Sequence, residues 1–380
     1  MRKVLVVFGT RPEAIKLAPV IRRLADDPRF TAVTCVTSQH REMLDQVLKV
    51  FEILPRYDLA VMQPGQSLAG VTARVVRRVS EVVGRERPDV VLVQGDTTTT
   101  FAAALAAFYH RVPVGHVEAG LRTADRHQPF PEEINRRLTG VLADYHYAPT
   151  ARSRDNLLAE GVDPGRILVT GNSGIDALLL AREWTRGRAG AEGLLGPGVS
   201  ALRDRRVILV TAHRRESFGA PLEAICDAIR RIADRNPDVE IVYPVHLNPH
   251  VRRPVFAWLG EHPRIHLVEP LDYPAFVRAM DRAYLILTDS GGVQEEAPAL
   301  GKPVLVMRHK TERAEAVEAG GARLVGTSVE TIVPAVQQLL DDGETYAAMS
   351  RAGNPFGDGR ASERIVEHLG GALQAAGARG

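Results

Sequence analysis

The sequence predicts an α/β protein built from two similar, doubly wound, Rossmann-like domains. Short β-branched runs bounded by turn residues recur along the chain, helical segments fill the gaps, and a polar segment separates the runs into two sets. Runs that are apolar almost throughout are typical of parallel strands, which helices cover on both faces. The length of 380 residues suits two domains of about 100–200 residues each.

The predicted strands fall into an N-terminal and a C-terminal set. The first set comprises residues 3–8, 32–37, 90–94, 112–117, 145–148 and 167–170, and the second comprises 207–211, 240–245, 265–268, 284–288, 304–307 and 323–325. Apolar residues at helical spacing predict the intervening helices, as in 13–24 and 222–233. The Gly- and Arg-rich segment 182–202 predicts a surface insertion.

These patterns also predict how the domains divide. We expect an N-terminal domain of residues 1–172 and a C-terminal, nucleotide-binding domain of residues 173–360. The C-terminal segment 361–380, helical in pattern over 361–369, is expected to join the first domain.

The composition excludes several classes of protein. Hydrophobic residues make up 45% and charged residues 25%, which excludes disordered and low-complexity chains. The 48 Lys and Arg against 46 Asp and Glu lack the basic excess of a nucleic-acid-binding protein. No apolar run approaches the ~18 residues of a membrane span, and Gly9 ends the first run too early for a signal peptide. We therefore expect a cytoplasmic protein without nucleic-acid or membrane partners.

Ligands of open parallel sheets bind beyond the carboxyl ends of the strands. Charged and imidazole side chains gather at these strand exits in both halves, which predicts a ligand cleft between two domains. The exits are residues 9–11, 38–40, 95–96, 118, 213–215, 246 and 289–292.

Residues 289–292 predict an anion site. Ser290, Gly291 and Gly292 precede a predicted helix, whose uncovered N–H groups and dipole suit a diphosphate, although an ordinary N-cap turn is the alternative. Glu296, one turn further, could accept ribose hydroxyls or form a structural ion pair.

Three carboxylates are candidates for acid–base chemistry. Asp96 and Glu118 each end an apolar strand, and carboxylates facing each other there would have their pKa values pushed apart. Glu132 and Arg136 are four apart on a helix that Pro131 can begin, so an exposed ion pair is the alternative for them.

Cationic and aromatic residues at the other exits could contact a nucleotide. The pairs Arg11 with Lys16 and His213 with Arg214 suit phosphate, or else form surface basic clusters. Phe276 could stack on a base or belong to the core. The P-loop, G-x-G-x-x-G, H-E-x-x-H and C-x-x-C motifs are absent, so we expect neither a cofactor nor a metal.

Seven motifs in order resemble those of the non-hydrolysing bacterial UDP-N-acetylglucosamine 2-epimerases. They are residues 8–16, 39–46, 95–99, 116–122, 131–136, 213–216 and 288–298. The resemblance implies a glycosyltransferase-B type fold with a central cleft, and reversible conversion of UDP-N-acetylglucosamine to UDP-N-acetylmannosamine without a cofactor.

The resemblance also implies roles for individual residues. Those implied for the nucleotide are Arg11, Ser290, Gly291 and Gly292 at the diphosphate, Glu296 at the ribose, and Leu271 and Phe276 at the uracil. Those implied for catalysis are Asp96, Glu118 and Glu132, assisted by Lys16, Arg136 and His213. Members are commonly dimeric and are often activated by a second UDP-N-acetylglucosamine, near positions that Gln39, Gln46, Arg214 and His246 match.

The residue inventory agrees with this chemistry. The C2 proton becomes acidic only when UDP leaves C1, and a carboxylate can then remove it to give 2-acetamidoglucal. Re-addition of UDP with protonation from the other face inverts C2, which requires cations at the diphosphate and at least two carboxylates at the sugar. A hydrolysing 2-epimerase, a retaining glycosyltransferase and a nucleotide-sugar-binding protein without catalysis are the alternatives.

Overall fold

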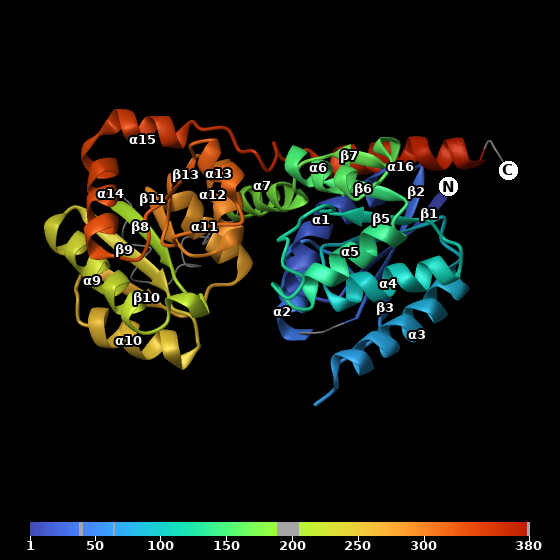
Figure 1. Cartoon of the computed structure of the whole chain (residues 1–380), viewed down its shortest axis with the longest axis horizontal. Coiled ribbons are helices and arrows are strands. Elements are labelled where there is room, and N and C mark those ends of the chain that lie inside the picture. Colours follow the sequence, from blue (N-terminus) through green and yellow to red (C-terminus); the bar gives the residue numbers. More distant parts are fainter. Residues whose placement is uncertain (38–40, 64, 188–204, 378–380) are drawn as a thin grey trace. The chain divides into compact units, whose positions relative to one another are not determined.

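The computed structural model describes residues 1–37, 41–63, 65–187 and 205–377, without the side chains of 41–43 and 376–377 (Figure 1). By its internal packing the chain forms two compact units. Unit 1 consists of Met1–Leu179 and Phe356–Gly380, and unit 2 of Leu180–Pro355. The domains predicted from the sequence, 1–172 with 361–380 and 173–360, stay a prediction.

Unit 1 contains a parallel sheet in the order β3-β2-β1-β4-β5-β6-β7. Its strands are β1 (Arg2–Phe8), β2 (Phe30–Val36), β3 (Tyr57–Asp58), β4 (Val90–Gln94), β5 (Val114–Val117), β6 (Tyr145–Ala148) and β7 (Ile167–Val169). Its helices are α1 (Arg11–Asp26), α2 (Arg41–Val50), α3 (Leu68–Glu86), α4 (Thr98–Tyr109), α5 (Glu132–Leu142), α6 (Ala151–Ala159) and α16 (Ala361–Gly377), with η1 (Pro164–Arg166) between α6 and β7. The helix α7 (Ser173–Arg186) begins in unit 1 and ends in unit 2.

Unit 2 contains a second parallel sheet, in the order β10-β9-β8-β11-β12-β13. Its strands are β8 (Arg206–Thr211), β9 (Val239–Pro244), β10 (Ile265–Val268), β11 (Leu285–Thr288), β12 (Val304–Val306) and β13 (Ala322–Leu324). Its helices are η3 (Arg215–Ser217), α9 (Ala220–Arg235), α10 (Pro249–Leu259), α11 (Tyr273–Arg282), α12 (Gly291–Ala299), α13 (Ala314–Glu318), α14 (Val329–Asp341) and α15 (Gly343–Ser350).

Both sheets have the doubly wound strand order of a Rossmann-like fold, in which the chain reverses direction across the sheet beside its first strand. The reversal lies between β1 and β4 in unit 1 and between β8 and β11 in unit 2. The fold class predicted from the sequence, with two α/β units each built on a parallel sheet, is confirmed. The strand exits on either side of these two reversals are therefore where ligands are expected.

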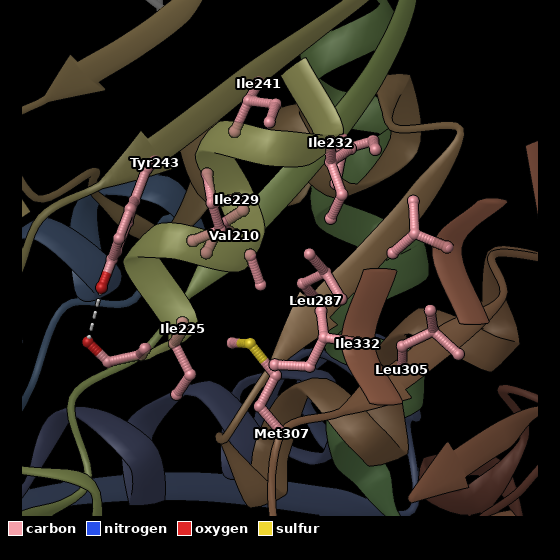
Figure 2. Close-up of a cluster of buried hydrophobic side chains, with 14 of the residues drawn as sticks. Val210, Ile225, Ile229, Ile232, Ile241, Tyr243, Leu287, Leu305, Met307 and Ile332 are labelled. Carbon is pink, nitrogen blue, oxygen red and sulfur yellow. Dashed lines mark hydrogen bonds between the residues drawn. The ribbon is translucent and has the colours of Figure 1, made fainter. Parts of the chain in front are cut away.

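The core of unit 2 shows why its helices form. Ile225, Ile229 and Ile232 recur at helical spacing on α9 and are fully or almost fully buried. Figure 2 shows them packed against sheet residues that include Val210 and Leu287, with Ile332 of α14 in the same cluster. The hydroxyl of Tyr243 donates to the carbonyl of Ala212 at 3.1 Å, so this buried polar group is satisfied.

The C-terminal helix α16 packs against α1 in unit 1. Asp176 of α7 accepts hydrogen bonds from the backbone N–H groups of Ala361 (3.1 Å) and Ser362 (2.8 Å). These are N–H groups that the first turn of a helix leaves without a partner, so Asp176 caps α16 from another element.

Each strand predicted from the sequence is present, whereas the two-residue β3 was not predicted. The predicted insertion 182–202 is helical up to Arg186, and from residue 188 it lies outside the described residues. None of the helices in the described part of the chain combines the length and apolar character needed to cross a membrane.

Candidate functional site

The exits of β1, β4 and β5 lie at one edge of the unit 1 sheet, because these strands are parallel neighbours. Glu118 follows β5 with a φ of 64°, in the left-handed region, and is 9% exposed. Its carboxylate pairs with Lys16 of α1 and accepts from the amides of Gln94, at the end of β4, and Asn172 (3.2 Å). Three segments far apart in sequence thus hold one carboxylate at the expected edge.

Asp96 is held at the same edge from α5. Its Oδ2 lies 2.5 Å from Nη2 of Arg136, and its carbonyl accepts from the amide of Asn135 at 3.0 Å. Arg136 also lies 3.5 Å from Glu133, a fully buried carboxylate. In the described part of the chain, Arg136 therefore pairs with Asp96 and Glu133 rather than with Glu132, the partner in the surface-pair alternative.

Three further predicted residues begin or follow helices at this edge. Arg11 and Glu132 are the first residues of α1 and α5, and both are half-buried. A helix that follows a parallel strand begins at the carboxyl edge of the sheet, so Glu132 starts on the same edge as Asp96 and Glu118. Lys16 lies further along α1, and its side chain reaches Glu118.

In unit 2, the exits of β8 and β11 are joined by Asp289, which is completely buried. One carboxylate oxygen accepts from the backbone N–H groups of His213 and Arg214, both at 2.7 Å. The other lies 3.3 Å from Nδ1 of His213. Partial burial lowers the pKa of His213 more than the charge of Asp289 raises it. The His213 ring stacks on that of His246, with centroids 5.6 Å apart.

The start of α12 has the features expected of the anion site predicted at residues 289–292. Ser290 is its N-cap residue, Gly291 its first residue, and Gly292 is exposed. A β-carbon on Gly291 would lie 3.4 Å from Cζ of Arg313 and 3.5 Å from Nη2 of Arg214. Two guanidinium groups therefore stand beside the open end of a helix, where the dipole also favours an anion.

Glu296 and the predicted uracil residues lie near the starts of α12 and α11. Burial, and to a smaller extent the charge of Glu296, raise the pKa of Tyr273, the first residue of α11, well above its ordinary value. Leu271 precedes α11, and Phe276 lies on its first turn; both are half-buried. Phe276 is thus not a fully buried core residue.

The residues predicted for a second site are described in part. Gln39 lies outside the described residues, and Gln46 is exposed on α2 in unit 1. Arg214 and His246 both lie at the strand exits of unit 2. The described residues contain no group of three His, Cys, Asp or Glu side chains placed to hold a metal ion.

Sequence reasoning missed four polar residues at these edges: Glu13, Gln94, Asn172 and Arg313. Gln94 and Asn172 donate to Glu118, and Arg313 flanks Gly291. Gln94 ends an apolar strand, a signal that could have selected it. Asn172 lies two residues after the predicted strand 167–170, as His213 does after 207–211, so the same signal could have selected it. Glu13 and Arg313 lie further from a strand end, and their positions depend on long-range packing.

Comparisons with known proteins agree in the family they indicate. The model of the UDP-N-acetylglucosamine 2-epimerase family matches residues 22–370. The UDP-N-acetylglucosamine 2-epimerase of Escherichia coli (strain K12) is 58% identical over 368 residues, which cover 97% of this chain and 98% of that protein.

Solved structures show the same similarity. The Neisseria meningitidis UDP-GlcNAc 2-epimerase bound to UDP-GlcNAc has a TM-score of 0.87 and 49% identity, covering 97% of this chain and 99% of that one. The Methanocaldococcus jannaschii UDP-GlcNAc 2-epimerase in complex with UDP-GlcNAc and UDP has a TM-score of 0.78 and 35% identity, with the same coverages.

Proposed function

Because the chain belongs to the UDP-N-acetylglucosamine 2-epimerase family, we propose that it interconverts UDP-N-acetylglucosamine and UDP-N-acetylmannosamine. The observation that carries the proposal is the set of carboxylates at one edge of the unit 1 sheet. Asp96 and Glu118 are each paired with a cation there, and Glu132 begins a helix at the same edge.

Unit 2 holds the nucleotide in this proposal. The diphosphate binds the start of α12 at Ser290, Gly291 and Gly292, with Arg11 of unit 1 as a further cation. Glu296 accepts the ribose hydroxyls, and Leu271 and Phe276 contact the uracil. Cationic groups beside the diphosphate stabilise the charge that develops as UDP leaves.

Unit 1 supplies the proton chemistry. When the C1–O bond breaks, its electron pair leaves with UDP, and C1 gains oxocarbenium character. A carboxylate then removes the C2 proton, and the C–H electron pair forms the C1–C2 double bond of 2-acetamidoglucal. A second acid protonates C2 from the opposite face as UDP re-adds to C1. Asp96, Glu118 and Glu132 are the proposed acids and bases, with Lys16, Arg136 and His213 assisting.

A proton NMR time course with UDP-N-acetylglucosamine in D₂O tests the reaction. We expect UDP-N-acetylmannosamine to appear with deuterium at C2 of both sugars. Release of UDP with free N-acetylmannosamine would identify the hydrolysing reaction, and dependence on an added acceptor would identify a transferase. UDP-sugar binding without isotope exchange would indicate a nucleotide-sugar-binding protein without catalysis.

Substitution of the carboxylates tests their roles. Because they contact the sugar and not the nucleotide in this proposal, Asp96→Asn and Glu118→Gln should each lower kcat by about 10²-fold or more. The Kd for UDP, measured by calorimetry, should stay near that of the wild type. Loss of UDP binding with unchanged turnover per bound substrate would make both residues structural.

We further propose that the protein is a homodimer. Phe108 and Tyr109 of α4 and Leu138 and Val141 of α5 expose between 42% and 83% of their surface. They lie at the C-terminal ends of two helices that pack together, and apolar patches of this kind mark interfaces. Light scattering should give twice the chain mass, and Val141→Glu should shift it toward the monomer. A monomeric wild type would refute this assignment.

A second UDP-N-acetylglucosamine is proposed as an activator, contacted by Gln46, Arg214 and His246. The stacking of His246 on His213 connects this group to a residue of the proposed active site. The initial rate should depend sigmoidally on substrate concentration in the wild type and hyperbolically in His246→Ala.

We also propose a cytoplasmic location, because UDP-sugars carry charges that prevent their unaided passage through membranes. Cell fractionation tests this proposal, and we expect the protein in the cytoplasmic fraction.

A further inference from the structure

Glu13 is a buried carboxylate that the proposed function does not use. It lies in the first turn of α1 and is 1% exposed. Its Oε2 accepts from the backbone N–H groups of Gly9 (3.1 Å) and Thr10 (2.7 Å). Accepting from the N-cap residue is ordinary for a glutamate at this helix position.

The other oxygen of Glu13 reaches a different part of the chain. Its Oε1 accepts from the hydroxyl of Thr97 (2.8 Å) and lies 3.1 Å from the hydroxyl oxygen of Thr100, whose one proton it shares with the carbonyl of Gln94 at 2.6 Å. Thr97 and Thr100 lie 84 and 87 residues further along the chain. Thr97 is the N-cap residue of α4, and its hydroxyl also accepts from the N–H of Thr100. Glu13 therefore joins the turn after β1 to the first turn of α4, across the position where the sheet reverses direction.

The two joined turns carry proposed site residues. Arg11 directly follows Thr10, and Asp96 directly precedes Thr97. Further along α1, Lys16 pairs with Glu118. The carboxylate of Glu13 thus sets the separation between the part of unit 1 that presents Arg11 and the part that presents Asp96.

We propose that Glu13 is a positioning residue for the epimerisation, holding the exits of β1 and β4 at a fixed separation so that Arg11 and Asp96 are correctly placed. The inference rests on the proposed function. Errors of about 1 Å in the position of reacting groups can lower rates by about 10²-fold, so a group that fixes two loops at once has a large effect without contacting substrate.

The chemistry of Glu13 supports a role beyond stability. Burial raises the pKa of Glu13, and its hydrogen bonds with Thr10, Thr97 and Gly9 oppose this shift. Its four hydrogen-bond partners are neutral groups. A glutamine has the same shape and can accept from the two backbone N–H groups while donating to the threonine hydroxyls. In glutamine, however, an NH2 group replaces the oxygen that accepts from Thr97, so this hydroxyl must accept from the amide while it also accepts from the N–H of Thr100.

Glu86 provides a matched control at the opposite end of the same sheet. It is also a buried glutamate of unit 1, 5% exposed, and accepts from Lys3 (3.0 Å) and from the hydroxyl of Tyr57 (2.5 Å). Lys3 lies near the start of β1, away from the strand exits. A substitution of Glu86 therefore perturbs a buried carboxylate without touching the proposed site.

The experiment compares Glu13→Gln, Glu13→Asp and Glu13→Ala with Glu86→Gln. For each variant we measure the urea midpoint at pH 8, the number and Kd of UDP sites by calorimetry, and kcat per UDP site. We expect kcat to fall about tenfold in Glu13→Gln and about 10²-fold in Glu13→Asp and Glu13→Ala, because aspartate is too short to reach both turns. The Kd for UDP should stay within about threefold, since unit 2 supplies most of the proposed contacts, and Glu86→Gln should keep kcat within about twofold.

Two readouts separate positioning from a purely structural role. Because Glu13→Gln keeps the shape of the buried side chain and its backbone hydrogen bonds, its urea midpoint should stay close to that of the wild type while kcat falls. If Glu13 acts through α4, then adding Thr100→Val to Glu13→Gln should lower kcat by less than the product of the two single effects. The glutamine variant keeps the test valid if Glu13→Ala does not fold.

A kcat of Glu13→Gln within twofold of the wild type, or an equal fall in Glu86→Gln, would overturn the proposal. So would parallel losses of stability and activity in all Glu13 variants. An inactive wild type would instead refute the proposed function, and the two failures are thereby distinguished.

Discussion

Asp289 offers the sharpest stability test, because it joins the strand exits of unit 2 as Glu13 joins those of unit 1. It is completely buried after β11, and its Oδ2 accepts from the backbone N–H groups of His213 and Arg214 at 2.7 Å. Asp289→Ala removes both hydrogen bonds. Asp289→Asn keeps an acceptor of the same shape but removes its charge.

The expected magnitudes follow from these contacts. A hydrogen bond to a charged group contributes about 1.5–3 kcal/mol. The side chain of His213 is 40% exposed, so water replaces part of the loss. We therefore expect Asp289→Ala to lower the free energy of unfolding by about 2–4 kcal/mol. Charge-assisted hydrogen bonds are roughly twice as strong as neutral ones, so Asp289→Asn should cost about 1–2 kcal/mol.

Tryptophan fluorescence during urea unfolding measures this loss. Trp184 and Trp258 are the two tryptophans of the sequence, and both lie in unit 2, so their emission reports its unfolding. The Kd for UDP should rise in the same order, because Arg214 stands beside the start of α12. The exposed pair of Glu269 with Arg252 supplies the control, and Glu269→Gln should leave both the midpoint and UDP binding unchanged.

The reasoning is refuted if Asp289→Ala loses less than about 0.5 kcal/mol, which is within the range of an ordinary surface substitution. It is also refuted if the asparagine variant is less stable than the alanine variant. Loss of stability with unaltered UDP affinity would separate Asp289 from the nucleotide site.

Three further predictions concern other contacts. Burial lowers the pKa of His116 to about 3, and its buried Nδ1 has no hydrogen-bond partner among the described residues. Below about pH 6.5 only the unfolded chain gains this proton, so each pH unit of acidification should lower the unfolding free energy by about 1.4 kcal/mol more in the wild type than in His116→Gln. Equal slopes of unfolding free energy against pH, measured by urea titration, would contradict this prediction. Gly291→Ala places a methyl group against Arg313 and over the start of α12. The Kd for UDP should therefore rise about tenfold, with an unchanged urea midpoint. An unchanged Kd would argue against diphosphate binding at the start of α12. Gln94→Glu places a second carboxylate beside that of Glu118. This like-charge pair should lower kcat by more than about tenfold, while UDP still binds. Full activity would show that the side-chain amide of Gln94 is dispensable.

Several features of the fold follow from local patterns. The predicted strands are present because near-continuous apolar runs of this length are typical of parallel strands that helices cover on both faces. The two-residue β3 was not predicted, since two residues carry no periodicity to recognise. Asp96, Glu118 and His213 were predicted as site residues because the end of an apolar run, and hence the end of a strand, is visible in the sequence.

The partners of these residues were not predictable in the same way. Arg136 and Glu132 suggested an ordinary pair on one helix, yet Arg136 extends to Asp96 across the unit. Glu13 was not selected as a site residue, yet its Oε1 contacts the first turn of α4. The spacing of residues within one helix predicts only the ion pairs and hydrogen bonds that form within that helix.

The order of residues in this chain, taken alone, determined which segments become strands and helices, where each strand ends and which family the motifs resemble, because these depend on short-range periodicity and residue type. The tertiary structure decided which charged groups meet. The contacts of Glu118, Asp96, Glu13 and Asp289 join segments that are tens of residues apart, and only the packing of parallel strands brings those segments within hydrogen-bond distance.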